Sequence, residues 1–431
     1  MTGGALSMRP ADLILLHAKE LITCAGEAPR RGSAQSRLDR TADGALAALE
    51  GRVVFTGPSD ELARRIAPLP HAQIYDLRDH TILPGFVDPH THAVFAGDRR
   101  GELRRRLAGE TYAEIAASGG GILETVRATR EADEDRLVSA TISRLDEMLA
   151  CGTTTCEIKS GYGLNLESEL KLLRVIKTVS RTHPMSIEAT FLGAHEIPPD
   201  YRNNRGEYVD LVCNEMIPAV RSERTATWCD VFCEDGVFTP VESRRILEAG
   251  QQAGLKSRIH ADELGPSGGS LVAAAVRARS ADHLVFVPAE GIRAMAEANV
   301  TATLLPTAAF YLKLARFAPA RELIAAGVPV ALATDINPGG GFSPSMPFAM
   351  SLACFRMNLT FEEALIASTI NAAWSIDRAA DAGSLEEGKY ADAVVVRGDA
   401  VNLLRVDADS IAAVITKGRV ASGRLIQHEP H

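Results

Sequence analysis

The strongest constraint on the fold is a unit that repeats between residues 81 and 335. In each repeat, a short apolar run ends in polar residues and precedes a segment with helical periodicity. Strands that alternate with helices indicate a parallel sheet, and eight of them close a (β/α)8 barrel, also called a TIM barrel. The expected strands are Ile82–His92, Thr153–Ser160, Ser186–His195, Trp228–Glu234, Ser257–Glu263, Ser280–Val285, Thr301–Pro306 and Pro329–Asp335, and the clearest helices are Asp133–Ala150, Glu167–Thr182, Val241–Ala253 and Ala289–Ala298.

The two ends of the chain have a different pattern, with short strands and glycine turns. Residues 45–55 predict one hairpin, and residues 412–420 predict another that turns at Lys417-Gly418. Such strands are typical of a β-sandwich. We therefore expect an α/β chain with a barrel over residues 81–375 and a smaller, discontinuous β-sandwich domain built from residues 1–80 and 376–431. The small and charged residues of Gly26–Gly44 predict a surface loop.

Composition narrows the class of protein. The chain has 431 residues, of which 46% are hydrophobic and 23% charged, as in ordinary globular enzymes. Its net charge of −9 disfavours nucleic acids and anionic membranes as partners. We find no signal-peptide pattern and no apolar stretch long enough to span a bilayer. Seven cysteines, an odd number without a C-x-x-C pair, imply no disulfide framework, so we expect a cytoplasmic protein. Base rates favour a homodimer.

Residues capable of chemistry gather where the expected strands end. Five of the eleven histidines lie there, and active sites of (β/α)8 barrels are built at that face. These positions therefore predict the location of a catalytic centre. They are His90, His92, Lys159, His195, Glu234, Asp235, His260, Glu263, His283 and Asp335.

Four of these residues form a candidate metal site. His90 and His92 are two positions apart, so in an extended strand both side chains point to one face. With His260 and Asp335 they offer three imidazoles and one carboxylate, a set that suits zinc or iron better than calcium. Such an ion lowers the pKa of bound water towards neutrality. Taken singly, His260 is also compatible with a core histidine and Asp335 with a helix N-cap.

Two further residues are candidates for proton transfer. Glu263 follows His260 by three positions, from where a carboxylate can move a proton between water and a leaving nitrogen. His283 is a candidate to polarise a carbonyl or to orient the water. The alternatives are a solvated carboxylate at the start of a loop for Glu263 and a buried histidine bonded to backbone for His283.

Longer motifs surround these residues. They are Pro84–Asp88 with His90-Thr91-His92, Phe95–Arg99, Gly119–Ile122 with Thr125-Val126 and Ala128–Arg130, Glu157–Gly163, Phe191–His195, His260–Glu263, Asp335–Gly339 and Gly383–Asp392. In these motifs the chain resembles the amidohydrolase superfamily and, within it, the imidazolonepropionase family, over nearly its whole length.

The resemblance implies an activity and a site. The activity is hydrolysis of the ring C–N bond of 4-imidazolone-5-propanoate to N-formimidoyl-L-glutamate in histidine degradation, with one divalent metal, Zn²⁺ or iron (Fe²⁺ or Fe³⁺). The implied metal ligands are His90, His92, His260 and Asp335, and the implied catalytic residues are Glu263, His283 and Asp335. The implied substrate contacts are Arg99, Tyr112, Tyr162, His195, Glu263, Asn337, Gly339 and Gly340.

The chemistry of these side chains is compatible with the substrate contacts that the resemblance implies. The guanidinium of Arg99 can hold a carboxylate through two parallel hydrogen bonds, although a surface arginine among its arginine neighbours is the alternative. Tyr162 and His195 can bond the ring nitrogen or the carbonyl oxygen. Gly340 departs from the family pattern, because many members have a hydroxyl residue there. At this position a backbone contact remains possible and a hydroxyl bond does not.

Two other functions stay open at this point. A deaminase or iminohydrolase that acts on a nucleobase or a formimidoyl compound would use the same metal ligands, and release of ammonia would identify it. A non-catalytic binding protein would contain no bound metal. The glycine runs Gly119–Gly121 and Gly339–Gly341 lack both the P-loop lysine and the spacing of a dinucleotide site, so they do not predict nucleotide binding.

Overall fold

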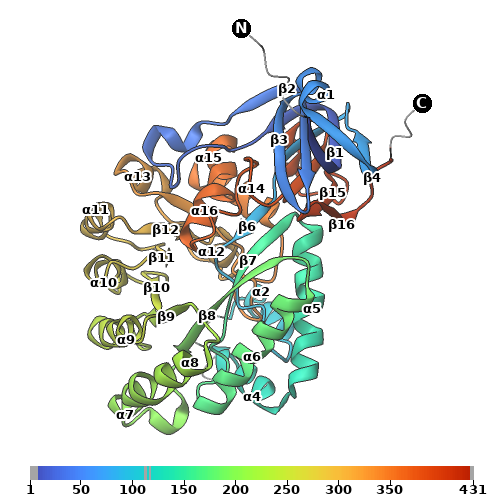
Figure 1. The fold of residues 1–431 in the computed structure, drawn as a ribbon. Coiled ribbons are helices and arrows are strands. Elements are labelled where there is room, and N and C mark those ends of the chain that lie inside the picture. The colour runs from blue at the N-terminus through green and yellow to red at the C-terminus, as the bar shows by residue number, and fades with distance from the viewer. Residues whose placement is uncertain (1–7, 111–113, 116–117, 428–431) are drawn as a thin grey trace.

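A parallel barrel forms the centre of the molecule (Figure 1), as the computed structural model shows over residues 8–110, 114–115 and 118–427. Eight parallel strands lie in the order β13-β12-β11-β10-β9-β8-β7-β6, so each strand neighbours the next one in sequence. The expected barrel is confirmed. Its strands are β6 (Phe86–Asp88), β7 (Thr153–Lys159), β8 (Ser186–Ala194), β9 (Trp228–Cys233), β10 (Lys256–Ala261), β11 (Ser280–His283), β12 (Thr301–Leu304) and β13 (Val330–Leu332).

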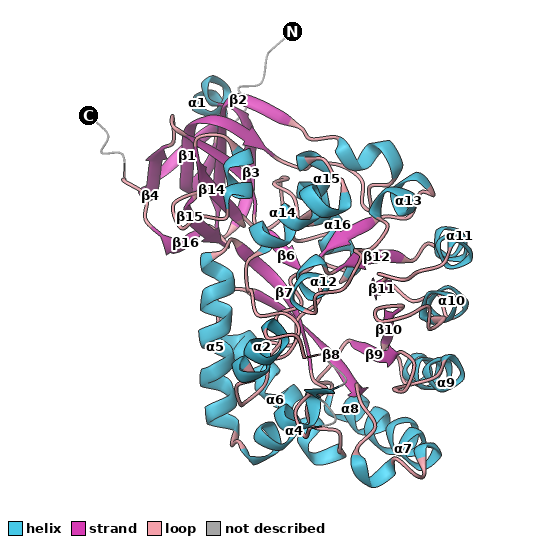
Figure 2. Ribbon diagram, turned by 180° about the vertical axis from the view of Figure 1, so that it is seen from behind, coloured by secondary structure: helices cyan, strands magenta, loops and turns pink. Residues whose placement is uncertain are grey.

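Helices cover the outer face of this barrel (Figure 2). Local sequence explains where several begin: the Asp133 side chain accepts from the backbone of Arg136, and Thr239 and Glu242 form a capping box. All expected helices are present to within one residue at each end, as α5 (Glu134–Ala150), α6 (Leu166–Thr182), α9 (Pro240–Gln252) and α11 (Ala289–Ala298). The others are α1 (Ser59–Arg65), α2 (Arg100–Leu107), α4 (Ile122–Glu131), α7 (Arg205–Leu211), α8 (Ile217–Glu223), α10 (Gly269–Ala275), α12 (Pro306–Tyr311), α13 (Ala320–Ala325), α14 (Met346–Met357), α15 (Phe361–Ala367) and α16 (Ile370–Ser375).

The expected first strand, Ile82–His92, is wrong as a single element. It is divided at Gly85 into β5 (His80–Pro84) and β6. Strand β5 pairs with β1 and β14 in a second sheet, whereas β6 pairs with β7 in the barrel. A Cβ at Gly85 would overlap the side chain of Thr154, so glycine permits the close crossing between the sheets. The other barrel strands end one to three residues earlier than expected, because the chain leaves the sheet there for a loop or, at Pro306, for α12.

Contacts beyond the strand ends connect β13 to β6. The Asp88 carboxylate accepts hydrogen bonds from the backbone and the hydroxyl of Thr334. The Asp335 amide donates to the His90 carbonyl at 3.2 Å. These bonds hold together the two segments that contain three of the expected metal ligands.

The second sheet unites both ends of the chain, as expected. Its order is β16-β15-β14-β5-β1-β2-β3, with β4 beside β1, and both expected hairpins are present. Leu15, Ile82, Val395 and Ile415, from widely separated strands, are buried in one apolar cluster. The division into domains at residues 80 and 376 stays a prediction. The strands are β1 (Arg9–Ile22), β2 (Arg40–Leu49), β3 (Arg52–Pro58), β4 (Ile66–Asp76), β5, β14 (Ala393–Arg397), β15 (Ile411–Thr416) and β16 (Arg419–Gly423).

The expectation of a surface loop over Gly26–Gly44 is confirmed only in part, because most of residues 26–39 are exposed or half-buried but two polar side chains among them are buried. Strand β2 begins at Arg40, and the segment before it docks against the barrel. Asn371 accepts from the Arg30 amide at 2.7 Å and donates to the Arg30 carbonyl at 2.9 Å. Gln35 is fully buried and accepts from the Val330 amide at 3.2 Å. Polar composition suggested exposure here, but these polar groups bond one another instead.

All seven cysteines lie in described residues and none forms a disulfide. Cys229 and Cys233 are buried in the strand β9. Across the described part of the chain, the helices are too short or too polar to cross a membrane.

Candidate active site

His90 and His92 lie in the loop that follows β6, at the C-terminal face of the barrel. The expectation that strand geometry aligns them is wrong, because neither residue is in a strand. Their side chains still converge, with ring centroids 5.2 Å apart, and both are buried. The loop is held by its neighbour, since the His92 amide donates to the Ile336 carbonyl at 2.9 Å.

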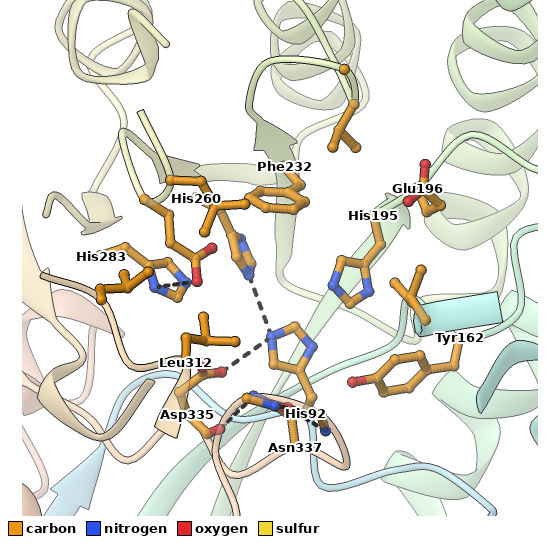
Figure 3. Close-up of a pocket in the computed structure, with 18 of the residues that line it drawn as sticks. His92, Tyr162, His195, Glu196, Phe232, His260, His283, Leu312, Asp335 and Asn337 are labelled. Atoms are coloured by element: carbon orange, nitrogen blue, oxygen red, sulfur yellow. Dashed lines mark hydrogen bonds and ion pairs between the residues drawn. The ribbon is translucent and has the colours of Figure 1, made fainter. Parts of the chain in front are cut away.

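His260, in β10, and Asp335, in the loop after β13, face the same point (Figure 3). Nε2 of His260 lies 3.3 Å from Nε2 of His92. Oδ1 of Asp335 lies 3.6 Å from Nε2 of His92 and 3.7 Å from Nε2 of His90. The structure thus brings together all the residues that the sequence predicted as metal ligands.

Two buried carboxylates determine which imidazole nitrogens of His90 and His260 face the point where the candidate ligands converge. Nδ1 of His90 bonds the Asp282 carboxylate at 2.7 Å, and Nδ1 of His260 lies 3.1 Å from the Asp230 carboxylate. A histidine that donates through Nδ1 presents a lone pair at Nε2, which is the arrangement found behind protein-bound metals. The carboxylates therefore turn the two Nε2 lone pairs inward.

This donor set fits a cation. Nε2 of His90 and Oδ1 of Asp335 are buried without a hydrogen-bond partner among the described residues. Burial, followed by Lys159 and the neighbouring histidines, lowers the pKa of His90 and of His92 well below the usual value, so both rings are neutral. Burial also raises the pKa of Asp335 to about 8. Converging lone pairs and a buried carboxylate repel one another unless a positive ion lies between them.

Two further triads of potential ligands overlap this set. His283 lies within reach of His90 and His260, and His195 lies within reach of His92 and His260. The shared members make the centre of the barrel rich in nitrogen donors. The described residues are therefore compatible with a metal site, in which His283 and His195 lie beside the four expected ligands.

A network of buried charged side chains contacts the carboxylates that bond the candidate ligands. Lys159 lies 2.8 Å from both Glu157 and Asp230, and Arg258 lies 3.0 Å from Asp282. Burial opposes the charge of Lys159, but Asp230 and Glu157 raise its pKa. Burial likewise opposes the charge of Asp230, but His260 and Lys159 lower its pKa well below its usual value. Lys159 and Asp230 thus form a buried, charged pair beneath the candidate ligands.

Sequence reasoning gave no role to Asp230, Asp282 or Arg258. A signal was present, because each is a charged residue inside a short, otherwise buried strand. Charged side chains are almost never fully buried unless they are paired. That rule marks them as parts of a polar centre, although it does not identify their partners.

Glu263 and His283 lie at one side of the candidate metal site. Oε1 of Glu263 is 3.4 Å from Nδ1 of His283, and Nε2 of His283 is buried without a partner among the described residues. Burial, then the neighbouring Asp335 and Glu234, raises the pKa of Glu263 well above its usual value. Asp335 (φ 53°) and His283 (φ 76°) adopt left-handed backbone conformations, which cluster at functional sites in non-glycine residues.

A cavity of about 540 Å³ opens onto these groups. Tyr162 and His195 form part of its wall, with ring centroids 5.3 Å apart. Nδ1 of His195 bonds the Gly161 carbonyl at 3.0 Å, so Nε2 is left as an acceptor. Burial lowers the pKa of His195 to about 3, which keeps this ring neutral. Phe232, Glu196 and Leu312, which sequence reasoning missed, also line the cavity.

Arg99 lines the same cavity and is buried, against the alternative of a surface arginine. Its Nη2 donates to Glu102 at 2.7 Å. Gly339 lies against the guanidinium, since a Cβ there would overlap Nη1. Arg99 therefore shares the wall of this cavity with three candidate metal ligands, which are His92, His260 and Asp335.

The remaining expected contacts divide into three cases. Asn337 uses its amide within its own loop, since its side chain donates to the Asp335 carbonyl at 2.8 Å and accepts from the Gly339 and Gly340 amides. Gly339 and Gly340 line the cavity through their backbone. Tyr112, also expected as a contact, lies outside the described residues.

A parallel barrel with imidazole and carboxylate donors at its C-terminal face is compatible with a metal-dependent hydrolase. The chain belongs to the amidohydrolase family, whose model matches residues 81–421. Within it the chain falls among the imidazolonepropionases. It is 50% identical to "Imidazolonepropionase" of Symbiobacterium thermophilum over 390 residues, 90% of this chain and 92% of that protein. It is 47% identical to "Imidazolonepropionase" of Haloarcula marismortui over 389 residues, 90% of each chain.

Solved structures confirm the fold. An adenosine deaminase from Xanthomonas campestris with bound zinc superposes with a TM-score of 0.74 at 19% identity, covering 98% of this chain and 96% of that one. The guanine deaminase of E. coli superposes with a TM-score of 0.72 at 18% identity, covering 95% and 99%. At such identities the likeness concerns architecture alone.

Proposed function

We propose that this protein hydrolyses the ring C–N bond of 4-imidazolone-5-propanoate and releases N-formimidoyl-L-glutamate, a step of histidine degradation. The observation that supports this most is the cavity itself. It joins a cluster of inward-facing donors to a buried arginine, as a small ring bearing a carboxylate requires. The names of the relatives point to the same substrate.

One divalent metal ion, zinc or iron, would be held by His90, His92, His260 and Asp335. When bound, it would supply Lewis acidity, which lowers the pKa of a water and polarises the ring carbonyl. Asp282 and Asp230 keep the Nε2 atoms of His90 and His260 directed at it.

The substrate would be held at both ends. Arg99 would bind the propionate carboxylate through paired N–H groups. His195 presents Nε2 as an acceptor, so it would receive a hydrogen bond from a ring N–H. The Tyr162 hydroxyl would donate to the second ring nitrogen or to the carbonyl oxygen. Backbone groups of Gly339 and Gly340 would complete the wall, with no hydroxyl contribution at residue 340.

Glu263 would transfer the proton. Its raised pKa suits a carboxylate that takes a proton from the attacking water and returns it to the departing ring nitrogen. A protonated Glu263 can donate to Nδ1 of His283 across 3.4 Å. The ring hydrogen of His283 then lies on Nε2, where it can donate to the developing oxyanion.

For the assembly we propose a homodimer, the commonest symmetric state, in the cytoplasm, where unpaired thiols persist. Sedimentation of the purified protein at micromolar concentration tests the dimer.

The experiment for the activity incubates the metal-loaded protein with 4-imidazolone-5-propanoate. We expect the ultraviolet absorbance of the imidazolone to fall while N-formimidoyl-L-glutamate accumulates in equal amount. An unchanged absorbance, together with ammonia release from nucleobases or formimidoyl compounds, would contradict the proposal and identify a deaminase or iminohydrolase.

A further inference from the structure

Glu102 holds Arg99 from one side. Arg99 precedes α2, and Glu102 lies in the first turn of that helix, with side chains only 5% and 7% exposed. Oε2 of Glu102 accepts from Nη2 of Arg99 at 2.7 Å, and Oε1 accepts from the Gly121 amide at 2.7 Å. Each carboxylate oxygen thus bonds a different segment, which fixes the direction of the pair.

Two glycine-rich segments enclose this ion pair. A Cβ at Gly120 would lie 2.9 Å from Oε1 of Glu102, and a Cβ at Gly339 would overlap Nη1 of Arg99. Gly120 and Gly339 therefore make room for the pair, one from each glycine run. Gly339 also lines the cavity, so the guanidinium lies at its wall.

Arg106 fastens the same helix to the second glycine segment. It lies four positions after Glu102, on the same buried face of α2. Its guanidinium donates to the carbonyls of Tyr311, at 3.1 Å, and Gly339. Glu102 and Arg106 thus bond the buried face of α2 to both glycine segments.

We propose that Glu102 is a positioning residue, which holds the Arg99 guanidinium in the orientation that binds the carboxylate of the substrate. The inference rests on the proposed function for the identity of that carboxylate. A free arginine side chain loses rotamer entropy when it is fixed. A buried partner that fixes it beforehand removes this cost from ligand binding.

The test measures binding without turnover. Calorimetry on the metal-loaded protein compares imidazole-4-propanoate with its carboxamide, which lacks the charge. We expect Glu102→Gln to weaken binding of the acid about tenfold, because binding must then order a guanidinium that Glu102 no longer fixes, and to leave the amide unchanged. The KM for 4-imidazolone-5-propanoate should rise more than kcat falls. Glu110→Gln, which neutralises an exposed partner of Arg105, is the matched control and should change neither.

A double-mutant cycle shows whether Glu102 acts through Arg99. If it does, Arg99→Lys with Glu102→Gln should lose little more affinity than Arg99→Lys alone. Fully additive losses would overturn the inference, as would unchanged or tighter binding of the acid by Glu102→Gln. If Glu102→Gln does not fold, Glu102→Asp replaces it, because that variant keeps the charge on a shorter side chain. An affinity for the acid equal to that of the parent would then overturn the inference.

The proposed function can fail separately. If the parent turns over the substrate but Glu102→Gln keeps full affinity for the acid, only the positioning role is contradicted. If the parent does not turn over the substrate but prefers the acid to the amide, and the Glu102→Gln variant has lost that preference, only the proposed substrate is contradicted. A parent with no preference for the acid over the amide overturns the positioning role.

Discussion

Two buried carboxylates decide which nitrogens of the ligand histidines face the centre of the barrel. Asp282 serves His90 and Asp230 serves His260, and each carboxylate is in turn bonded to a buried cation. The candidate metal site therefore depends on residues that would not touch the metal. The affinity for metal should therefore change when a carboxylate that bonds a ligand histidine is replaced.

We expect Asp282→Asn to lower metal affinity by roughly tenfold to a hundredfold, the usual effect of removing an outer partner of a ligand histidine. The amide no longer fixes the tautomer of His90 and leaves Arg258 without its charge partner. Competition with a calibrated chelator measures the affinity. Asp146→Asn is the control, because it alters a carboxylate–histidine pair with His183 on the exterior. Equal affinity in the Asp282 variant and the parent would refute the orienting role.

Glu263→Gln should abolish most turnover while metal binding is kept. The amide preserves the volume of Glu263 but cannot accept a proton, and positioned acid–base groups contribute roughly 10²–10⁴-fold to rate. Steady-state kinetics and elemental analysis of the same sample measure both quantities. The exposed Glu290→Gln, in the first turn of α11, is the control. Near-normal kcat in Glu263→Gln would remove this residue from the mechanism.

The sequence indicates the ligand histidines better than the residues that orient them. Histidines at the ends of hydrophobic runs stand out along the chain. Asp282 and His90 are 192 residues apart, and their contact follows only from the closure of the barrel. The same holds for Glu102, whose neighbouring arginines suggest a solvated helix face until the two glycine segments enclose it.

Among the elements, the junction between the two sheets rests on Gly85. The chain leaves β5 and enters β6 there, with the Gly85 amide donating to the Asp392 carbonyl at 2.8 Å. Sequence periodicity could not reveal this break, because both strands are apolar and buried, so the hydrophobic run continues through it. What distinguishes the two strands is their pairing partners, which lie far along the chain.

Gly85→Ala should destabilise the protein by roughly 1–3 kcal/mol, the range for overpacking a filled interior, because the new methyl group overlaps Thr154. The midpoint of urea unfolding measures the loss. Gly101→Ala is the control, since a Cβ in this helical position meets open space and should maintain or raise stability. A Gly85→Ala midpoint equal to that of the parent would show that the junction relaxes freely.

Over the whole molecule, the barrel was predictable because its strands are buried on both faces and appear as regular hydrophobic runs. The sheet built from both chain ends was predictable from its hairpins. The docking of residues 26–44 was not, because polar groups such as Gln35 and Asn371 satisfy one another inside the protein. Composition alone cannot distinguish paired polar groups from solvated ones.

Metal removal should lower the melting temperature of the entire chain. A ligand that binds only the folded state stabilises it by about 4 kcal/mol at a thousandfold excess over Kd. The four donors also come from segments that close the barrel, so their repulsion acts across β6, β10 and β13. Calorimetric scans before and after chelation, with zinc or ferrous iron restored, measure the shift. A melting temperature that changes neither on chelation nor on restoring the metal would contradict the link between metal binding and stability.

Anomalous diffraction from metal-loaded crystals would show whether His90, His92, His260 and Asp335 bind one ion. Data collected at the absorption edge of zinc or iron should show a single strong peak about 2.0–2.2 Å from the three Nε2 atoms and Oδ1 of Asp335. A peak elsewhere, or none in a sample that elemental analysis shows to be loaded, would contradict the account.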